Sequence, residues 1–195
     1  MIRLGLTGSI GMGKSVTAKM FAAEGVPVHD ADAAVHALYS GRAAPLIEAA
    51  FPGTVTDGKV DRKLLSPRVL DKPEAMKRLE AIVHPLVREV EEEFLEKARA
   101  ARRRLVVMDI PLLFETDSMR RVDVAVVVTA DARIQRQRVL ARPGMTEDRF
   151  HSILQKQMPD AEKRRRAHFL LDTGHGMEPA RRGVRAILKA LAGCG

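Results

Sequence analysis

The sequence predicts an α/β fold in which a doubly wound, parallel sheet of five strands is covered by helices. Short β-branched runs alternate with helical stretches along the 195 residues, as in strand–helix–strand units. The first apolar run, residues 2–7, leads through a glycine-rich loop into a helical pattern, where Val16, Met20 and Phe21 recur at helical spacing. In such sheets ligands bind at the carboxyl ends of the strands, so polar residues at those ends form the candidate site.

The same patterns predict the other elements in chain order. Apolar runs predict further strands at residues 26–29, 105–108, 122–128 and 169–171. Helical periodicity predicts helices at residues 30–40, 62–71, 74–83, 131–142, 146–157 and 179–191.

A helix boundary is expected at His84-Pro85. Pro85 would open a long new helix, because proline is tolerated in a first helical turn. The apolar stripe of this helix is Leu86, Val90, Phe94 and Ala98. On the opposite face, Glu91, Glu92 and Arg99 are predicted to face water.

Composition and charge narrow the classes of function. The formal charge of +8 suits nucleic acid or polyphosphate ligands. Basic residues cluster at residues 102–104, 133–149 and 163–166. Aromatic residues make up only 4%, and none interleaves with these basic clusters, so no nucleic-acid partner that stacks on the protein is expected. No membrane partner is expected either, because no apolar run approaches the roughly 20 residues that cross a bilayer.

The sequence favours a reducing, cytoplasmic location. The first predicted strand begins at residue 2, which is expected to leave no room for a signal peptide. Cys194 is the single cysteine, so neither an internal disulfide nor a cysteine metal site is expected.

The strongest motif is residues 8–15, which read G-x-x-x-x-G-K-S between a predicted strand and a predicted helix. In this context the backbone N–H groups of the loop form a cradle for phosphate at the start of a helix. Lys14 is expected to contact the outer phosphates and the Ser15 hydroxyl to ligate Mg²⁺. The ATP-binding residues predicted around the motif are Gly8, Gly11, Met12, Gly13, Lys14, Ser15 and Val16.

Carboxylates follow two other predicted strands. Asp109 closes an apolar run, where a Walker-B aspartate holds Mg²⁺ directly or through water; the alternative is a turn or helix cap. Ile110 rather than a glutamate follows it, which argues against an ATP-driven motor. Asp30 and Asp32 follow the second strand and cannot share a helix face. One is expected to cap the next helix and the other to be a base for an acceptor hydroxyl, unless both are solvated turn residues.

A basic helix supplies candidate cations for phosphate. Arg138 and Arg142 are four residues apart, so they share one helix face. Two guanidinium groups aimed at a transferring phosphoryl group can neutralise the charge that develops there. A basic surface helix explains the spacing equally well.

Two further blocks are more specific than the glycine loop: His-Pro-Leu-Val at residues 84–87 and Pro-Leu-Leu-Phe-Glu at residues 111–115, in this order. With these blocks the chain resembles, from end to end, the dephospho-CoA kinase family of P-loop kinases. The other matching blocks are Leu6-Thr7-Gly8 with the glycine loop, residues 25–32 ending in Asp-Ala-Asp, Gln135 with Arg138 and Arg142, and Gln157.

The resemblance implies ATP- and Mg²⁺-dependent phosphorylation of the ribose 3′-hydroxyl of dephospho-CoA, the last step of coenzyme A biosynthesis. Asp32 matches the catalytic carboxylate of the family, with Lys14 and Arg138 acting on the phosphates. Ser15 and Asp109 would hold the metal, and Arg142 would join the ATP site. The acceptor-binding residues implied are Thr7, Asp32, His84, Leu112 and Leu113.

The resemblance also implies a single P-loop kinase domain with three parts. The core comprises residues 1–40, 105–130 and 167–195. A helical acceptor-binding insertion spans about 41–104, and a helical lid that closes over the phosphates spans about 131–166.

One block departs from the family pattern. Where the family has Ala-Asp, a short apolar stretch and Asp-Asn, this chain has His168 in place of the first Asp and Thr173 in place of the Asn. The block is expected near the nucleotide base, so the way in which adenine is held is open. His168 is predicted to be a surface residue.

Two other functions stay open on the sequence. Another small-molecule P-loop kinase, acting on a nucleoside or a shikimate-like alcohol, would share the glycine loop. A nucleic-acid-binding ATPase would use the basic clusters and show strongly salt-dependent binding. A GTPase is disfavoured, because the sequence has no Asn-Lys-x-Asp motif.

Overall fold

The computed structural model describes residues 1–193, and Cys194, the single cysteine, lies outside the described residues. The chain divides into two compact units. The first comprises Met1–Val28 and Arg102–Gly195, and the second comprises His29–Ala101. Among residues 1–193, no helix is both long enough and apolar enough to cross a membrane.

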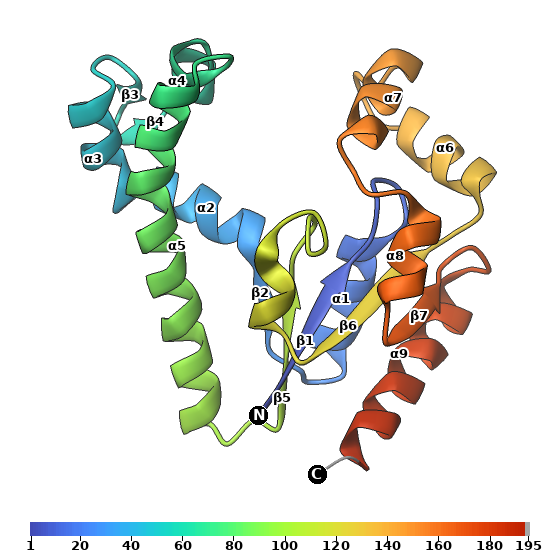
Figure 1. Ribbon diagram of the computed structural model, residues 1–195. Helices are drawn as coiled ribbons and strands as arrows, with labels where there is room; N and C mark the ends of the chain where they lie inside the picture. The colour runs from blue at the N-terminus through green and yellow to red at the C-terminus, as the bar shows by residue number, and fades with distance from the viewer. Residues whose placement is uncertain (194–195) are drawn as a thin grey trace. The chain divides into compact units, whose positions relative to one another are not determined.

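The first unit is built on a parallel sheet with the strand order β2-β5-β1-β6-β7 (Figure 1). The strands are β1 (Ile2–Thr7), β2 (Val28–Asp30), β5 (Leu105–Asp109), β6 (Val124–Thr129) and β7 (Phe169–Asp172). Of these, β2 runs from Val28 of the first unit into His29 and Asp30 of the second. For the described residues, this sheet confirms the prediction of an α/β fold with a parallel five-stranded sheet. The strand order is not sequential, because helices connect parallel strands by crossovers.

The sheet is apolar because helices cover it. Residues 125–128 of β6 are completely buried, as in a parallel strand covered on both faces. Helix α1 (Lys14–Ala23) packs against β1 and against α9 (Met177–Ala192), whose buried residues recur every three or four positions. Phe21 of α1 and Val184 of α9 meet in the core between these helices and the sheet.

The carboxyl ends of the strands place polar residues at one edge of this unit. Asp109 pairs in register with Leu6, next to Thr7, and Thr129 pairs with Asp172. The segments that follow are a 3₁₀ helix, η1 (Asp117–Arg121), after β5, and the helices α6 (Ala132–Leu140), α7 (Glu147–Gln155) and α8 (Asp160–Arg166) after β6.

The second unit is helical and has a core of its own. Its elements are α2 (Ala31–Tyr39), α3 (Ala43–Ala50), a hairpin of β3 (Val55–Thr56) and β4 (Lys59–Val60), α4 (Arg62–Val69) and α5 (Pro73–Ala100). Leu38, Ile47 and Leu79 belong to the core cluster that these elements share.

The predicted break at His84-Pro85 is wrong. Pro85 lies inside α5, a single helix of 28 residues. Proline removes one hydrogen bond of a helix, but packing can outweigh that loss. Val83 is buried on one side of Pro85 and Leu95 on the other, and α5 packs against α2, α3 and α4.

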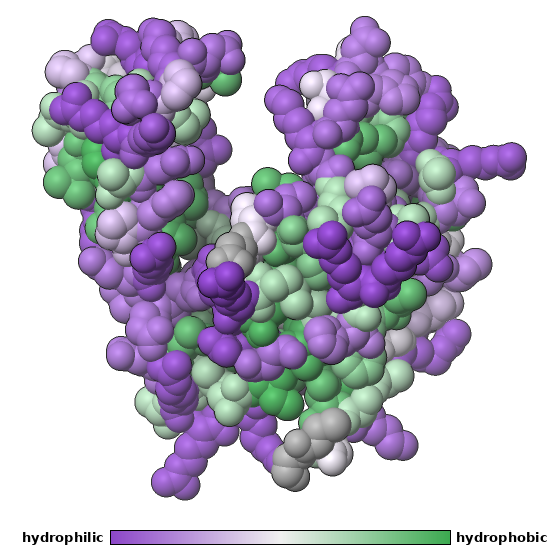
Figure 2. All heavy atoms as spheres, in the orientation of Figure 1, coloured by the Kyte–Doolittle hydropathy of each residue, from purple (hydrophilic) through white to green (hydrophobic). Residues whose placement is uncertain are grey.

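The outer face of α5 is mostly as predicted. The side of α5 that faces the viewer in Figure 2 is mostly hydrophilic, and Glu92 and Arg99 are exposed and pair at 2.6 Å. Glu91 differs from the prediction, because it is half-buried.

Four features have no counterpart in the sequence analysis. They are α3, the β3–β4 hairpin, η1 and α8. Helix α8 lacks an apolar stripe, and the one residue that it buries completely is Lys163. Hydrophobic periodicity cannot reveal such a helix.

Candidate active site

The glycine loop between β1 and α1 has a backbone that requires glycine at two positions. The φ angles of Gly11 and Gly13 are 79° and 93°, in the left-handed region. A Cβ at Gly11 would also lie 2.5 Å from Val139 and 2.9 Å from the Gln135 carbonyl oxygen. Gly13 is the N-cap of α1, so the unpaired N–H groups of the first helical turn lie at the loop. The loop can therefore receive an anion.

Lys14 and Asp109 meet beside this loop. Lys14 Nζ lies 2.5 Å from Asp109 Oδ1, and the two side chains are 17% and 3% exposed. The pairing of β5 with β1 brings Asp109 to the loop, because Asp109 is the last residue of β5 and Leu6 is its partner in β1. The structure thus brings together a lysine predicted to bind phosphate and a carboxylate predicted to hold metal.

The donor atoms near the loop fit a magnesium ion. Ser15 is exposed in the first turn of α1 and offers a hydroxyl oxygen, and Asp109 offers a carboxylate. Among the described residues, no group of three or more His, Cys, Asp or Glu side chains could hold a metal. Mg²⁺ does not need such a group, since it binds through one or two protein oxygens, substrate phosphates and water.

Arg138 and Arg142 line a cavity of about 320 Å³ beside the glycine loop. Gly11 and Gly13 line it from the loop, and Met177 lines it from α9. Both arginines therefore face the same space, as their spacing predicts.

Arg138 is fixed by two hydrogen bonds to Thr173. Its guanidinium donates to Thr173 Oγ1 at 2.9 Å and to the Thr173 carbonyl at 2.7 Å. The Thr173 hydroxyl in turn donates to the Met12 carbonyl of the glycine loop at 2.8 Å. Thr173 thus joins the basic helix α6 to the loop.

A family model described as dephospho-CoA kinase matches residues 2–178. The dephospho-CoA kinase of Mesorhizobium japonicum is 65% identical over 193 residues, which cover 99% of this chain and 98% of that relative. The chain belongs to the dephospho-CoA kinase family. The relative from Brucella melitensis biotype 1, also named dephospho-CoA kinase, is 58% identical and covers 99% of this chain and 96% of its own. The chain is a kinase, and the predicted family is confirmed.

Solved structures agree on the fold of this dephospho-CoA kinase family member. A crystal structure of a Thermus thermophilus protein has a TM-score of 0.84 at 36% identity and covers 97% of each chain. A shikimate kinase from Acinetobacter baumannii, in complex with shikimate, has a TM-score of 0.55 at 16% identity and covers 99% of this chain and 94% of its own. The second likeness shows the fold alone, which is that of P-loop kinases.

The two residues that depart from the dephospho-CoA kinase pattern, His168 and Thr173, lie in different places. His168 is exposed, and it bonds to Ala125 near the start of β6, where its Nδ1 accepts the Ala125 N–H at 3.1 Å. That is the end of the strand away from the glycine loop. Thr173 lies at the other end and contacts the loop directly. The open question about the nucleotide site therefore concerns Thr173 and not His168.

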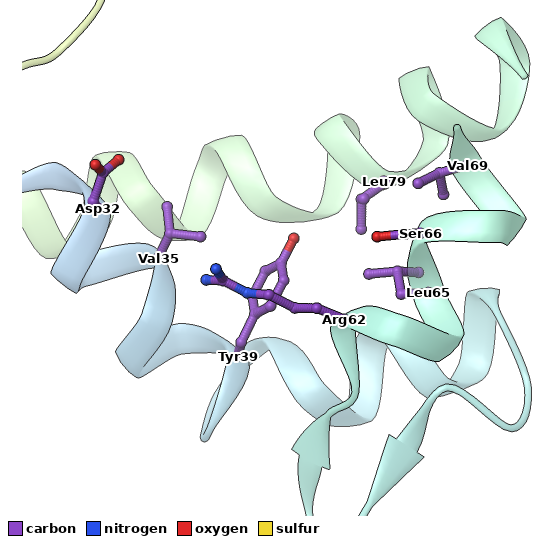
Figure 3. Close-up of a pocket in the computed structure, with 8 residues that line it drawn as sticks. All are labelled: Asp32, Val35, Tyr39, Arg62, Leu65, Ser66, Val69 and Leu79. Carbon is purple, nitrogen blue, oxygen red and sulfur yellow. The ribbon is translucent and has the colours of Figure 1, made fainter. Parts of the chain in front are cut away.

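The two aspartates after β2 have different environments. Asp30 is the N-cap of α2, and its Oδ1 accepts the Ala33 N–H at 2.9 Å, which confirms that one of the pair is a cap. Asp32 lies in the first turn of α2, is exposed, and lines a cavity of about 500 Å³ within the second unit (Figure 3).

This cavity also contains residues that the sequence analysis missed. The Arg62 guanidinium lies 5.3 Å from the centre of the Tyr39 ring, and Figure 3 shows the two side chains against each other. Burial raises the pKa of Tyr39, and the Arg62 charge partly opposes that effect. Leu65, Val69 and Leu79 form the apolar end of the cavity. One weak signal in the sequence could have pointed to this cavity, since Tyr39 is the single tyrosine of the chain.

The other predicted acceptor residues differ in how far their side chains are exposed. Thr7 is completely buried, and its hydroxyl donates to the Pro111 carbonyl at 3.0 Å. Leu113 is completely buried and Leu112 is 39% exposed. His84 is exposed on α5 in the second unit. Of the two leucines, only Leu112 has a side chain open to a ligand.

Proposed function

We propose that this chain transfers the γ-phosphoryl group of ATP to the ribose 3′-hydroxyl of dephospho-CoA, giving CoA and ADP as the last step of coenzyme A biosynthesis. The observation that carries the proposal is the glycine loop at the start of α1, with Lys14 and Asp109 paired beside it, in a member of the dephospho-CoA kinase family. The acceptor follows from the names of relatives at up to 65% identity.

The nucleotide occupies the first unit in this proposal. The loop N–H groups receive the phosphates, and Lys14 contacts the outer ones by a charge-assisted hydrogen bond. The base enters the cavity lined by Val16 and Met177. Arg138 and Arg142, on the wall of that cavity, neutralise charge on the transferring group.

Ser15 and Asp109 are the proposed holders of Mg²⁺. Their oxygen atoms are of the type that this ion prefers. When bound, the ion neutralises charge on the β- and γ-phosphates.

The acceptor is proposed to bind the cavity of the second unit. Asp32 lies at one end, the Arg62 guanidinium in the middle, and apolar side chains at the other end (Figure 3). A guanidinium suits the diphosphate of dephospho-CoA, and an apolar end suits its aliphatic arm. Thr7, His84, Leu112 and Leu113 are carried from the family motif as further acceptor residues, with Thr7 and Leu113 acting through packing because both are buried.

Asp32 is the proposed base. Its carboxylate orients the 3′-hydroxyl and takes the proton as the bond from the 3′-oxygen to the γ-phosphorus forms and the bond to the ADP oxygen breaks. Phosphoryl transfer passes through a loose transition state, so positioning contributes more than deprotonation.

The proposal includes the division of the chain into a core, an acceptor insertion at about 41–104 and a lid at about 131–166. It also includes a cytoplasmic location, which the single cysteine and the dependence on ATP support.

A substrate panel tests the function. The purified chain is incubated with ATP and Mg²⁺ and with dephospho-CoA, shikimate, adenosine or single-stranded nucleic acid, and ADP is measured. Of these added compounds, we expect only dephospho-CoA to cause rapid ADP release. Release stimulated by shikimate or adenosine would indicate another kinase, and release stimulated by nucleic acid would indicate an ATPase.

A further inference from the structure

Two glutamine side chains hold Ile10 of the glycine loop from both sides. The Ile10 N–H donates to Gln157 Oε1 at 3.1 Å, and the Ile10 carbonyl accepts from Gln135 Nε2 at 2.7 Å. Gln135 is buried in α6, and Gln157 is half-buried in the linker between α7 and α8. Neither side chain has a role in the proposed transfer.

Each glutamine is itself fixed by its surroundings. Gln135 lies one turn before Val139, a completely buried residue that packs where Gly11 leaves room. Next to Gln157, the Met158 N–H donates to Glu115 Oε1 at 2.8 Å. The two amide groups therefore connect the loop to α6 and to the linker between α7 and α8, within the same unit.

We propose that Gln135 and Gln157 are positioning residues for phosphoryl transfer, which keep the glycine loop in the shape that receives phosphate. The inference rests on the proposed use of ATP. Gly11 follows Ile10 directly, and glycine loses more conformational freedom on ordering than any other residue. Side chains that fix the loop before the nucleotide arrives reduce the entropy lost on binding.

The two hydrogen bonds run in opposite directions, which gives a sharp test. Gln157 acts as an acceptor and Gln135 as a donor. Glutamate has nearly the shape of glutamine, but its carboxylate accepts hydrogen bonds and cannot donate them. Gln157→Glu therefore keeps its bond, whereas Gln135→Glu turns an oxygen toward the Ile10 carbonyl. Both variants add one negative charge beside the same residue.

The experiment measures ADP affinity by calorimetry on the full chain, together with the KM for dephospho-CoA. We expect Gln135→Glu to bind ADP about tenfold more weakly than Gln157→Glu, since an unpaired buried polar group costs about that factor. The KM for dephospho-CoA should stay the same in both. Gln137→Glu on α6 and Gln155→Glu on α7 are matched controls, because both side chains are exposed, and they should bind ADP like the wild type.

Three results would overturn the inference. If Gln135→Glu and Gln157→Glu lose the same ADP affinity, the added negative charge alone would explain the effect on the phosphates. A lower melting temperature of Gln135→Glu with unchanged ADP affinity would show a purely structural role. If Gln135→Glu does not fold, Gln135→Met replaces it, and wild-type ADP affinity in that variant would contradict the proposal. Failure of the wild type to phosphorylate dephospho-CoA, with the ADP pattern intact, would instead refute the acceptor.

Discussion

The ammonium group of Lys163, a completely buried residue of α8, lies 2.9 Å from Glu115 Oε1. Glu115 ends the Pro-Leu-Leu-Phe-Glu block of the family resemblance, and it also accepts the Met158 N–H. The pair therefore joins the segment after β5 to the helices after β6. A completely buried lysine requires such a partner, because an unpaired buried charge is strongly unfavourable.

This pair predicts a dependence of stability on pH. Burial raises the pKa of Glu115, but the hydrogen bonds from Lys163 and Met158 outweigh it, so the pKa lies below its ordinary value. A lowered folded-state pKa stabilises the protein fully above the unfolded pKa of about 4.3, and the contribution disappears as the pH falls through the folded value. Chemical denaturation between pH 6 and pH 3 measures the free energy of unfolding. This free energy should be larger for the wild type than for Glu115→Gln at pH 6, and the difference should shrink below about pH 4.3.

Glu89→Gln serves as the control for that titration. Glu89 pairs with Arg42 at 3.5 Å, and both side chains are exposed, so its replacement should change the pH profile little. If the free energies of unfolding of wild type and Glu115→Gln differ by the same amount at every pH, the lowered pKa of Glu115 would be contradicted.

Replacing Lys14 and Ser15 should abolish most turnover for different reasons. Lys14→Ala removes a cation from phosphate and also from the buried Asp109 carboxylate, so the free protein should lose about 3 kcal/mol of stability. Ser15→Ala removes one proposed ligand of Mg²⁺, so raised Mg²⁺ should restore part of its rate but none of the Lys14→Ala rate. Magnesium titrations of kcat separate the two, and wild-type kcat in both would exclude the loop as the active site.

Lysine at position 138 should not perform the function of the arginine. The guanidinium makes two hydrogen bonds to Thr173, and an ammonium group lacks that planar fork. We expect kcat to fall about tenfold, because hydrogen bonds to a charged group contribute roughly 1.5–3 kcal/mol. Arg136 lies on the same helix as Arg138, but it is exposed and pairs with Glu147 of α7, so Arg136→Lys should keep the wild-type rate. Normal kcat and KM in Arg138→Lys would return α6 to the interpretation of a basic surface helix.

Asp30 and Asp32 should separate stability from chemistry. Asp30→Ala removes the N-cap of α2 and should cost about 1 kcal/mol, or roughly 2–4 °C in melting temperature, with little change in kcat. Asp32→Asn should lower kcat on the order of 10²-fold, while ATP affinity stays near wild type. Rate and melting temperature are measured side by side, and loss of turnover in Asp30→Ala alone would reverse the two assignments.

Much of the site around the glycine loop could be predicted from the sequence, because its features are local. A strand, a glycine loop and a helix follow one another within 25 residues, so the loop and Lys14 were identifiable without tertiary contacts. The ends of the strands also located Asp109.

The remainder depends on contacts between distant residues. Thr173 meets Met12 across 161 positions of sequence, and no spacing rule connects them. The continuity of α5 through Pro85 comes from packing on both sides of the proline, which overrides local propensity. Leu112 and Leu113 look equivalent in the sequence, yet only one of them is buried completely.

The most direct measurement follows the phosphoryl group itself. The chain is incubated with ATP labelled at the γ-phosphate, Mg²⁺ and dephospho-CoA, and the product is analysed by mass spectrometry and ³¹P NMR. The account predicts one labelled phosphate on the ribose 3′-oxygen for each ADP formed, and loss of this product in Lys14→Ala. ADP formed without labelled CoA, or label on any other oxygen of the acceptor, would contradict it.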